Sequence, residues 1–289
     1  MFTSISRGAR RRWVVPVALA VASAIGFSTL VSTSSQATAT KADDKILKVA
    51  LVNEIDTLNP FTAVLRSSTG ILMLQYESLV QFAQKDNAIV PGMASKWETS
   101  ADGLTWTFTI PEDREWSDGE PLTAKDAAWT FTNIMEKEPM QAANGGLVTN
   151  MASVTAKDDE TLEIVLKEPQ APNPGAELPI VPEHIYGEEA DASKFANDKD
   201  GVGSGPFVVK SFSAGGSLEL VANKKFWRGA PKIDGITYVT YKSTDAAVQA
   251  LKTGEIDLIG DLAPAQFEAL EGAKNITCLL YTSPSPRDS

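Results

Sequence analysis

Five short segments of this chain alternate between apolar and polar residues, and this pattern constrains the fold more than any other feature of the sequence. The segments are residues 104–110, 161–166, 206–212, 217–221 and 236–241. A period of two places apolar side chains on one face of a strand and polar side chains on the other. Such strands pair as antiparallel sheets with one face on a core and one face in water. We therefore predict a mixed α and β fold in which sheet dominates.

Other patterns predict the elements between these strands. We predict a buried strand over Ile46–Val52, a short strand over 256–259, and helices over 70–80, 244–254 and 264–270. A further helix begins after Thr123, a good N-cap residue with Asp126 three positions on, and Thr244 is the expected cap of the helix that ends at Gly254. Five prolines make 169–182 a connection, and 187–204 reads as a polar surface loop.

The N-terminus has the pattern of a secretory signal. Four arginines between positions 7 and 12 precede an apolar run over Val14–Val31, and an Ala-x-Ala pattern follows at Ala37–Ala39. This order predicts a signal peptide over residues 1–39, with cleavage before Thr40. Two alternatives stay open: an uncleaved N-terminal anchor, and export by the twin-arginine route through Arg11-Arg12. In each case we expect the protein outside the cytoplasm.

The cysteine content and the net charge exclude several structural features and several classes of partner. Cys278 is the only cysteine, so no disulfide can form within the chain, and no cysteine follows the apolar run to carry a lipid. The net charge is −11, and removal of the four signal-peptide arginines leaves 22 basic against 37 acidic residues, or −15. Nucleic acid and anionic membranes both need basic surface, so we expect neither as a partner.

Signals of catalysis are few. His184 is the only histidine, and a structural role at a helix start is the simpler interpretation. The chain has no Gly-x-Ser-x-Gly elbow, and the glycine-rich stretch 201–206 lacks the lysine of a phosphate loop. Carboxylate pairs are too frequent in this acidic chain to single one out. We predict a protein that is not an enzyme and that has neither a cofactor nor a metal site.

The C-terminal residues 278–289 fit no helix or strand period and contain two Ser-Pro pairs. They resemble the translation of a sequencing adapter joined to a broken gene. We therefore expect a non-native tail over 278–289 and a natural chain that continues beyond Thr277. The alternative is a natural disordered tail.

A series of blocks resembles the family-5 extracellular solute-binding proteins, the oligopeptide and dipeptide-binding type of ABC importers. The blocks follow the family order, and their sequences are DTLNP at 56–60, YESLV at 76–80, PGMASKW at 91–97, DGLTWTF at 102–108, REWSDGEPLTAKD at 114–126, GSGPF at 203–207, NKKFW at 223–227 and ALKTGEID at 250–257. Each block alone is weak, and their order over residues 46 to about 272 makes the resemblance specific.

The resemblance implies a periplasmic-binding-protein-like type II (cluster C) fold with two lobes and a hinge. It places a discontinuous first lobe at 46–75 plus 180–277 and an inserted subdomain at 76–179. The second lobe would follow near residue 275 and would be missing from this sequence. Ligand would lie in the cleft between the lobes and favour a closed form that docks on the permease.

The resemblance also implies the ligand and its contacts. The loop at 63–67 would face the cleft, with Val64, Leu65, Arg66 and Ser67 as ligand contacts, and Arg66 either meets a ligand carboxylate or is simply solvated. Ser243 and Thr244 would offer hydroxyl and N–H groups to a ligand, or serve only as a helix cap. Asp261 lies near the expected crossing into the second lobe.

We expect a monomer that delivers peptides or similar small solutes to the membrane subunits of an ABC permease. Three alternatives remain: a nickel chelate or sugar bound by the same fold, a secreted hydrolase, and a non-functional fragment.

Overall fold

A computed structural model of the chain describes residues 44–83, 85–260 and 262–279. The strands are β1 Ile46–Leu51, β2 Val80–Phe82, β3 Ile89–Pro91, β4 Lys96–Thr99, β5 Thr105–Thr109, β6 Met151–Ala156, β7 Thr161–Leu166, β8 Phe207–Phe212, β9 Ser217–Ala222 and β10 Gly235–Thr240. The helices are α1 Arg66–Gln75, α2 Ala124–Glu136, α3 Gln141–Val148, α4 Glu183–Tyr186, α5 Thr244–Thr253 and α6 Pro264–Leu270, with short 3₁₀ turns at Glu138–Met140 and Ala192–Lys194.

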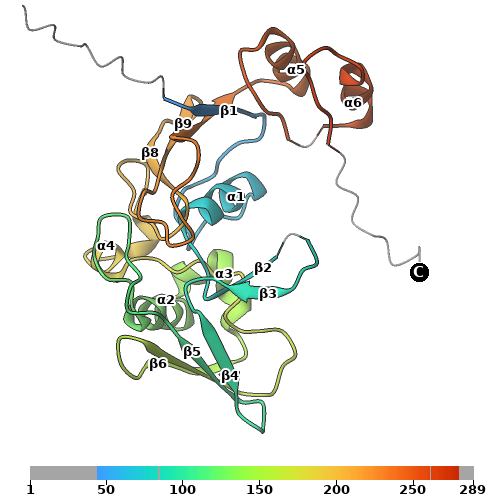
Figure 1. The fold of residues 1–289 in the computed structure, drawn as a ribbon. Coiled ribbons are helices and arrows are strands. Elements are labelled where there is room, and N and C mark those ends of the chain that lie inside the picture. Colours follow the sequence, from blue (N-terminus) through green and yellow to red (C-terminus); the bar gives the residue numbers. More distant parts are fainter. Residues whose placement is uncertain (1–43, 84, 261, 280–289) are drawn as a thin grey trace, which may run out of the picture. The chain divides into compact units, whose positions relative to one another are not determined.

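The first four-stranded sheet, sheet A, has the order β1-β10-β9-β8 (Figure 1). β1 and β10 are parallel, with Ile46 opposite Gly235 and Leu51 opposite Thr240, while β10, β9 and β8 pair antiparallel. On the other side of β1, Val49 makes a parallel bridge with Leu258. Strands from the two ends of the described chain therefore lie side by side in one sheet.

The second four-stranded sheet, sheet C, has the order β4-β5-β7-β6, and every pairing in it is antiparallel. Burial alternates along β5 and β7 as the sequence pattern predicts. The buried residues are Trp106 and Phe108 in β5 and Leu162 and Ile164 in β7, and their neighbours along each strand are partly exposed. α2 packs on β6 and β7 of this sheet. β2 and β3 form a separate two-stranded ribbon.

Two main hydrophobic cores lie under these sheets, and α1 contributes to both. Ile71 packs in the core of sheet A, whereas Leu72, the next residue, packs in the core that includes sheet C and α2. Consecutive helical residues point in directions about 100° apart, so one helix can serve two cores at adjacent positions. The predicted division into 46–75 plus 180–277 and 76–179 stays a prediction.

Most of the predicted elements are confirmed. The strands at 46–52, 104–110, 161–166, 206–212, 217–221 and 236–241, the helix over 264–270, the irregular connection at 169–182 and the left-handed Gly254 that ends α5 are all present within a residue or two. The predicted burial of the strand at 46–52 is not found, since Val49 is the only buried residue of β1. Sheet does not dominate, because helices and strands cover similar lengths of the described chain. Ala127, Phe131 and Ile134 are buried on one face of α2, as its period predicts.

Four local predictions were wrong in detail. The helical pattern at 70–80 belongs to α1, which begins at Arg66 and ends at Gln75, and Val80 starts β2. The strand over 256–259 is only the bridge at Leu258. Ser243 caps α5 by accepting from the N–H of Ala246 at 3.2 Å, and Thr244 is its first helical residue.

The fourth correction concerns the polar segment 187–204, which is not a pure surface loop. Asn197 is buried and donates its side-chain amide to the carbonyl of Leu58 at 2.8 Å. Ser204 is also buried, and its hydroxyl accepts from the N–H of Glu77 at 2.9 Å. These polar side chains satisfy backbone groups inside the protein, which composition alone does not reveal.

The predicted signal peptide at 1–39 and all but the first two residues of the predicted tail at 278–289 lie outside the described residues. Within the part of the chain that the structure describes, no helix has the length and apolar character needed to cross a membrane.

The capping box of α2 provides the first test of the fold. Asp126 is buried and accepts hydrogen bonds from the N–H groups of Thr123 and Glu183, both at 2.9 Å. Burial raises the pKa of this carboxyl, although the two N–H groups oppose the shift. Asp126→Ala leaves two donors unpaired, so we expect the free energy of unfolding to fall by roughly 2 kcal/mol in urea titrations. Lys125→Ala, which removes only an exposed ion pair to Asp159, should change little. An equal loss in both variants would contradict this account of the cap.

Candidate functional site

The carboxyl ends of three parallel chain segments meet at one edge of sheet A. β1 and β10 run parallel, and the bridge at Leu258 runs parallel to β1 on its other side. The chain therefore leaves this edge three times, at residues 52–56, 241–243 and 259–260. In open sheets with parallel strands, ligands bind beyond the carboxyl ends of the strands. We call this region the carboxyl edge and the three segments by which the chain leaves it the exits. Every predicted site residue follows one of these exits in the sequence.

Asp56 organises the first exit. Its carboxylate accepts from the N–H groups of Val64 at 2.8 Å and Leu65 at 3.2 Å, and it also accepts from the hydroxyl of Ser68. Burial alone would raise the pKa of Asp56, but these hydrogen bonds prevail and hold it below its ordinary value. The carboxylate thus occupies the N-terminal end of α1, where backbone N–H groups favour negative charge. This fixes the path of residues 57–65.

The predicted ligand contacts in the 64–67 loop differ in their exposure and in their hydrogen bonds. Val64 is 63% exposed and Leu65 is 40% exposed, and Arg66 is also exposed. Ser67 is half-buried, and its hydroxyl donates to the carbonyl of Glu54. The loop therefore exposes apolar surface at Val64 and Leu65, whereas the donor of Ser67 is already used within the fold.

The second exit carries Ser243 and Thr244. The Ser243 hydroxyl accepts from Ala246 and so acts as the cap of α5, while Thr244 is partly exposed at the first turn. Topology brings this pair and the 64–67 loop to the same edge of the sheet.

The third exit leads toward Asp261, which itself lies outside the described residues. Its neighbours Gly260 and Leu262 line a pocket of about 960 Å³ between α5, α6 and residues 274–279. The walls are polar and apolar in equal measure, with Leu258, Phe267 and Ile276 among the apolar side chains and Asp257 and Lys274 among the charged ones. Val64 to Ser67 and Ser243 to Thr244 line neither this pocket nor the smaller one described next.

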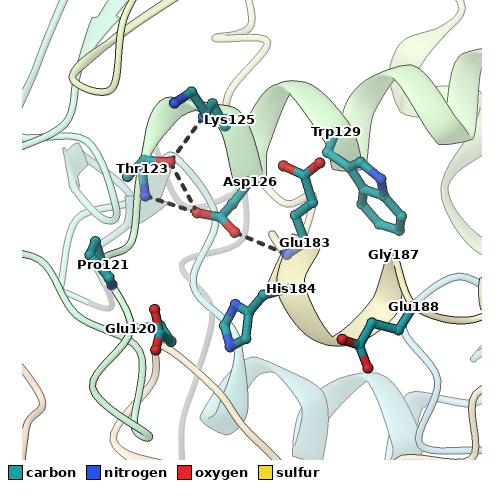
Figure 2. Close-up of a pocket in the computed structure, with 10 residues that line it drawn as sticks. All are labelled: Glu120, Pro121, Thr123, Lys125, Asp126, Trp129, Glu183, His184, Gly187 and Glu188. Carbon is teal, nitrogen blue, oxygen red and sulfur yellow. Dashed lines mark hydrogen bonds between the residues drawn. The ribbon is translucent and has the colours of Figure 1, made fainter.

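A second pocket, of about 490 Å³, lies between the start of α2 and α4 (Figure 2). Its lining contains the carboxyl groups of Glu120, Asp126, Glu183 and Glu188 together with His184 and Trp129. Sequence reasoning missed this site, because its residues come from a capping box and from a four-residue helix that follows the proline-rich connection. No periodic pattern marks such a meeting point.

The polar groups of this pocket serve mainly structural roles. Asp126 caps α2, and Nε2 of His184 lies 2.8 Å from Oδ2 of Asp118. Burial raises the pKa of Glu183, and the charge of Asp126 adds to that shift. The hydroxyl of Thr123 accepts from the N–H of Lys125 (Figure 2). The lining has no Ser or Cys beside His184.

Among residues 44–83, 85–260 and 262–279, no three His, Cys, Asp or Glu side chains are placed to hold a metal ion.

Comparison with known proteins decides the family. Residues 88–288 match the model of the bacterial extracellular solute-binding proteins, family 5 middle. The chain belongs to this family.

Relatives of this solute-binding protein agree with the assignment. It is 29% identical over 237 residues to the dipeptide-binding protein DppE of Bacillus subtilis, across 74% of this chain and 42% of DppE. Among solved structures, the ABC transporter substrate-binding protein CtaP of Listeria monocytogenes is 27% identical with a TM-score of 0.71, across 80% of this chain and 47% of CtaP. MoaA of Agrobacterium tumefaciens R10, solved with mannopinic acid, is 27% identical with a TM-score of 0.70, across 78% and 47%.

These comparisons confirm the predicted family and its mixed α and β binding-protein fold. The chain spans less than half of the length of each of these relatives.

A pH titration tests the role of Asp56 in this solute-binding protein. Because its pKa is lower in the folded state than its ordinary value of 3.8, Asp56 stabilises the fold above that value. The contribution disappears as pH falls through the lower folded pKa. We expect Asp56→Asn to be less stable than the wild type in urea at pH 7, and the difference to shrink steadily as the pH is lowered below 3.8. A difference that does not change as the pH is lowered would mean that the carboxylate charge is not what holds the loop.

Proposed function

We propose that this protein is the extracytoplasmic solute-binding component of an ABC importer and that its solute is a peptide. The carboxyl edge is the observation that carries the proposal, because it gathers the ends of three parallel segments in a chain whose family binds extracellular solutes. The name of the DppE relative supports a peptide as the solute.

The carboxyl edge suits an extended peptide better than a compact charged solute. Val64 and Leu65 offer exposed apolar surface, while Asp56 already fills the N-terminal end of α1 with negative charge. A second anion at that helix end would meet repulsion. Peptide side chains can pack on Val64 and Leu65. Ser243 acts as a cap, so Thr244 contributes through its partly exposed first-turn position.

We further propose the lobe assignment implied by the family: a first lobe from 46–75 plus 180–277, and an inserted subdomain at 76–179. A second lobe, encoded beyond Thr277, closes over the carboxyl edge when peptide binds. The closed monomer then delivers its ligand to the permease without cleaving it.

A second candidate solute is a sugar-derived acid. It rests on MoaA, whose solved structure holds mannopinic acid and which is as similar to this chain as CtaP is. Within one fold, different pocket contacts select different solutes, so ligand binding must be measured to separate the two.

Calorimetry with the complete reading frame separates these candidates. We expect a pool of di- to pentapeptides to bind and mannopinic acid not to bind. Peptide at about 100 times its dissociation constant should stabilise the protein by about 2.7 kcal/mol. Mass spectrometry of the recovered peptides should show no cleavage. Binding of mannopinic acid alone would overturn the peptide proposal, and peptide cleavage would overturn the transport role.

A substitution at the apolar surface tests the site itself. Val64→Asp places a charge where peptide side chains are proposed to pack, so we expect peptide affinity to fall at least about tenfold, or about 1.4 kcal/mol. Leu147→Asp is the matched control, since Leu147 is 40% exposed on α3 and should leave affinity unchanged. Equal losses of peptide affinity in both variants would show that the 64–67 loop is not part of the binding site.

A further inference from the structure

The loop between β9 and β10 crosses from sheet A to residues of the 76–179 segment. We call residues 223–229 the strap. Its base is Asn223, which is buried and donates its side-chain amide to the carbonyl of Gly205 at 3.0 Å. The Asn223 side chain also accepts from the N–H of Lys225 at 2.9 Å, which turns the chain outward. The strap therefore leaves sheet A along a fixed path.

The far end of the strap meets a buried carboxylate. Glu77 is 2% exposed, accepts from Nε1 of Trp227 at 2.6 Å and forms an ion pair with Arg228 at 3.1 Å. Burial raises the pKa of Glu77 above its ordinary value, even though Trp227 and the charges of Arg228 and Arg114 oppose the shift. A buried carboxylate without such partners would be strongly destabilising, so Glu77 depends on the strap.

Two guanidinium groups enclose the same indole. Cζ of Arg114 lies 3.4 Å from the Trp227 ring centroid, and Cζ of Arg228 lies 4.6 Å from it. Arg114 is buried, and its Nε has no hydrogen-bond partner. Stacking on the indole is thus a main interaction that holds the Arg114 guanidinium in place.

Arg228 extends the strap to the two-stranded ribbon. It donates to the side chain of Gln81 in β2 at 3.0 Å and to the carbonyl of Pro91 in β3 at 2.6 Å. Gln81 in turn donates to Glu77 at 3.2 Å. One short loop therefore contacts both strands of the ribbon and the turn that carries Arg114.

We propose that the strap locks the β2-β3 ribbon and the Arg114 turn onto sheet A as one rigid body, and that the indole N–H of Trp227, donated to buried Glu77, is the group that closes the lock. Trp227 and Glu77 are then positioning residues, whose loss releases the ribbon while the two sheets stay folded.

The strap contains its own matched control. Lys225 pairs with Glu115 at 3.0 Å, and both side chains are more than 40% exposed. Exposed ion pairs contribute little to stability. Lys225→Ala therefore removes a contact between the same two regions without touching the buried carboxylate.

Hydrogen exchange of the native chain tests the lock. Trp227→Phe keeps an aromatic ring beside the two guanidinium groups and removes the indole N–H together with the fused five-membered ring. We expect exchange of amides in residues 80–82, 89–91 and 225–229 to speed up about tenfold or more, because a hydrogen bond to a charged group is lost. Amides of β7 should change less than about twofold, since they open only with the whole fold. Lys225→Ala should behave as the wild type does.

A second variant keeps the test decisive. Glu77→Gln should release the same amides, and the double variant Glu77→Gln with Trp227→Phe should release them no more than the stronger single variant does, because both act on one contact. Additive effects, an equal acceleration in β7, or an equal effect of Lys225→Ala would each overturn the proposal.

Discussion

The parallel pairing of β1 with β10 is the constraint on which the rest of the described structure depends. Six residue pairs join Ile46–Leu51 to Gly235–Thr240, across a loop of more than 180 residues. Closing so long a loop costs conformational entropy that local contacts do not repay. The apolar side chains of Val49, Ile71 and Ile236, buried in one core, offset this cost. Once the pair is closed, the intervening chain must leave and return at fixed points.

Those fixed points explain why the candidate site lies where it does. Parallel strands release the chain at one edge, and Asp56 and Ser243 then turn it into α1 and α5. Both side chains are used within the fold, whereas Val64 and Leu65 are exposed. A site of this kind has few polar side chains in fixed positions that a ligand must match. That fits a family fold whose solved members hold unlike solutes, such as the mannopinic acid in MoaA.

The sequence predicted features with a local physical cause. Alternation at Thr105–Thr109, the capping box at Thr123 and the left-handed Gly254 are each determined within a few residues, and each is confirmed. The sequence pattern predicts Thr244 as the cap of α5, but Ser243 is the cap. The two cannot be separated by pattern because both residue types are good N-caps and they are adjacent. The site residues followed from family resemblance alone, and their role as ligand contacts stays a prediction.

Features that join distant segments could not be predicted. The Glu77 carboxylate accepts a hydrogen bond from Trp227, which lies 150 positions further along the chain. No sequence pattern around either residue predicts this contact. Burial of Asn197 in a polar segment has the same cause, since its partner is the carbonyl of Leu58. The pocket between α2 and α4 also forms only when the chain is folded. Such contacts depend on topology, which periodicity does not encode.

Hydrogen exchange of the complete gene product, with and without a bound peptide, tests the central claim most directly. If the carboxyl edge of sheet A is the binding surface, amides of residues 64–67 and 243–246 will exchange more slowly with peptide present. Slower exchange confined to the pocket around Glu183 and His184, with residues 64–67 unchanged, would contradict the account and move the site to the start of α2.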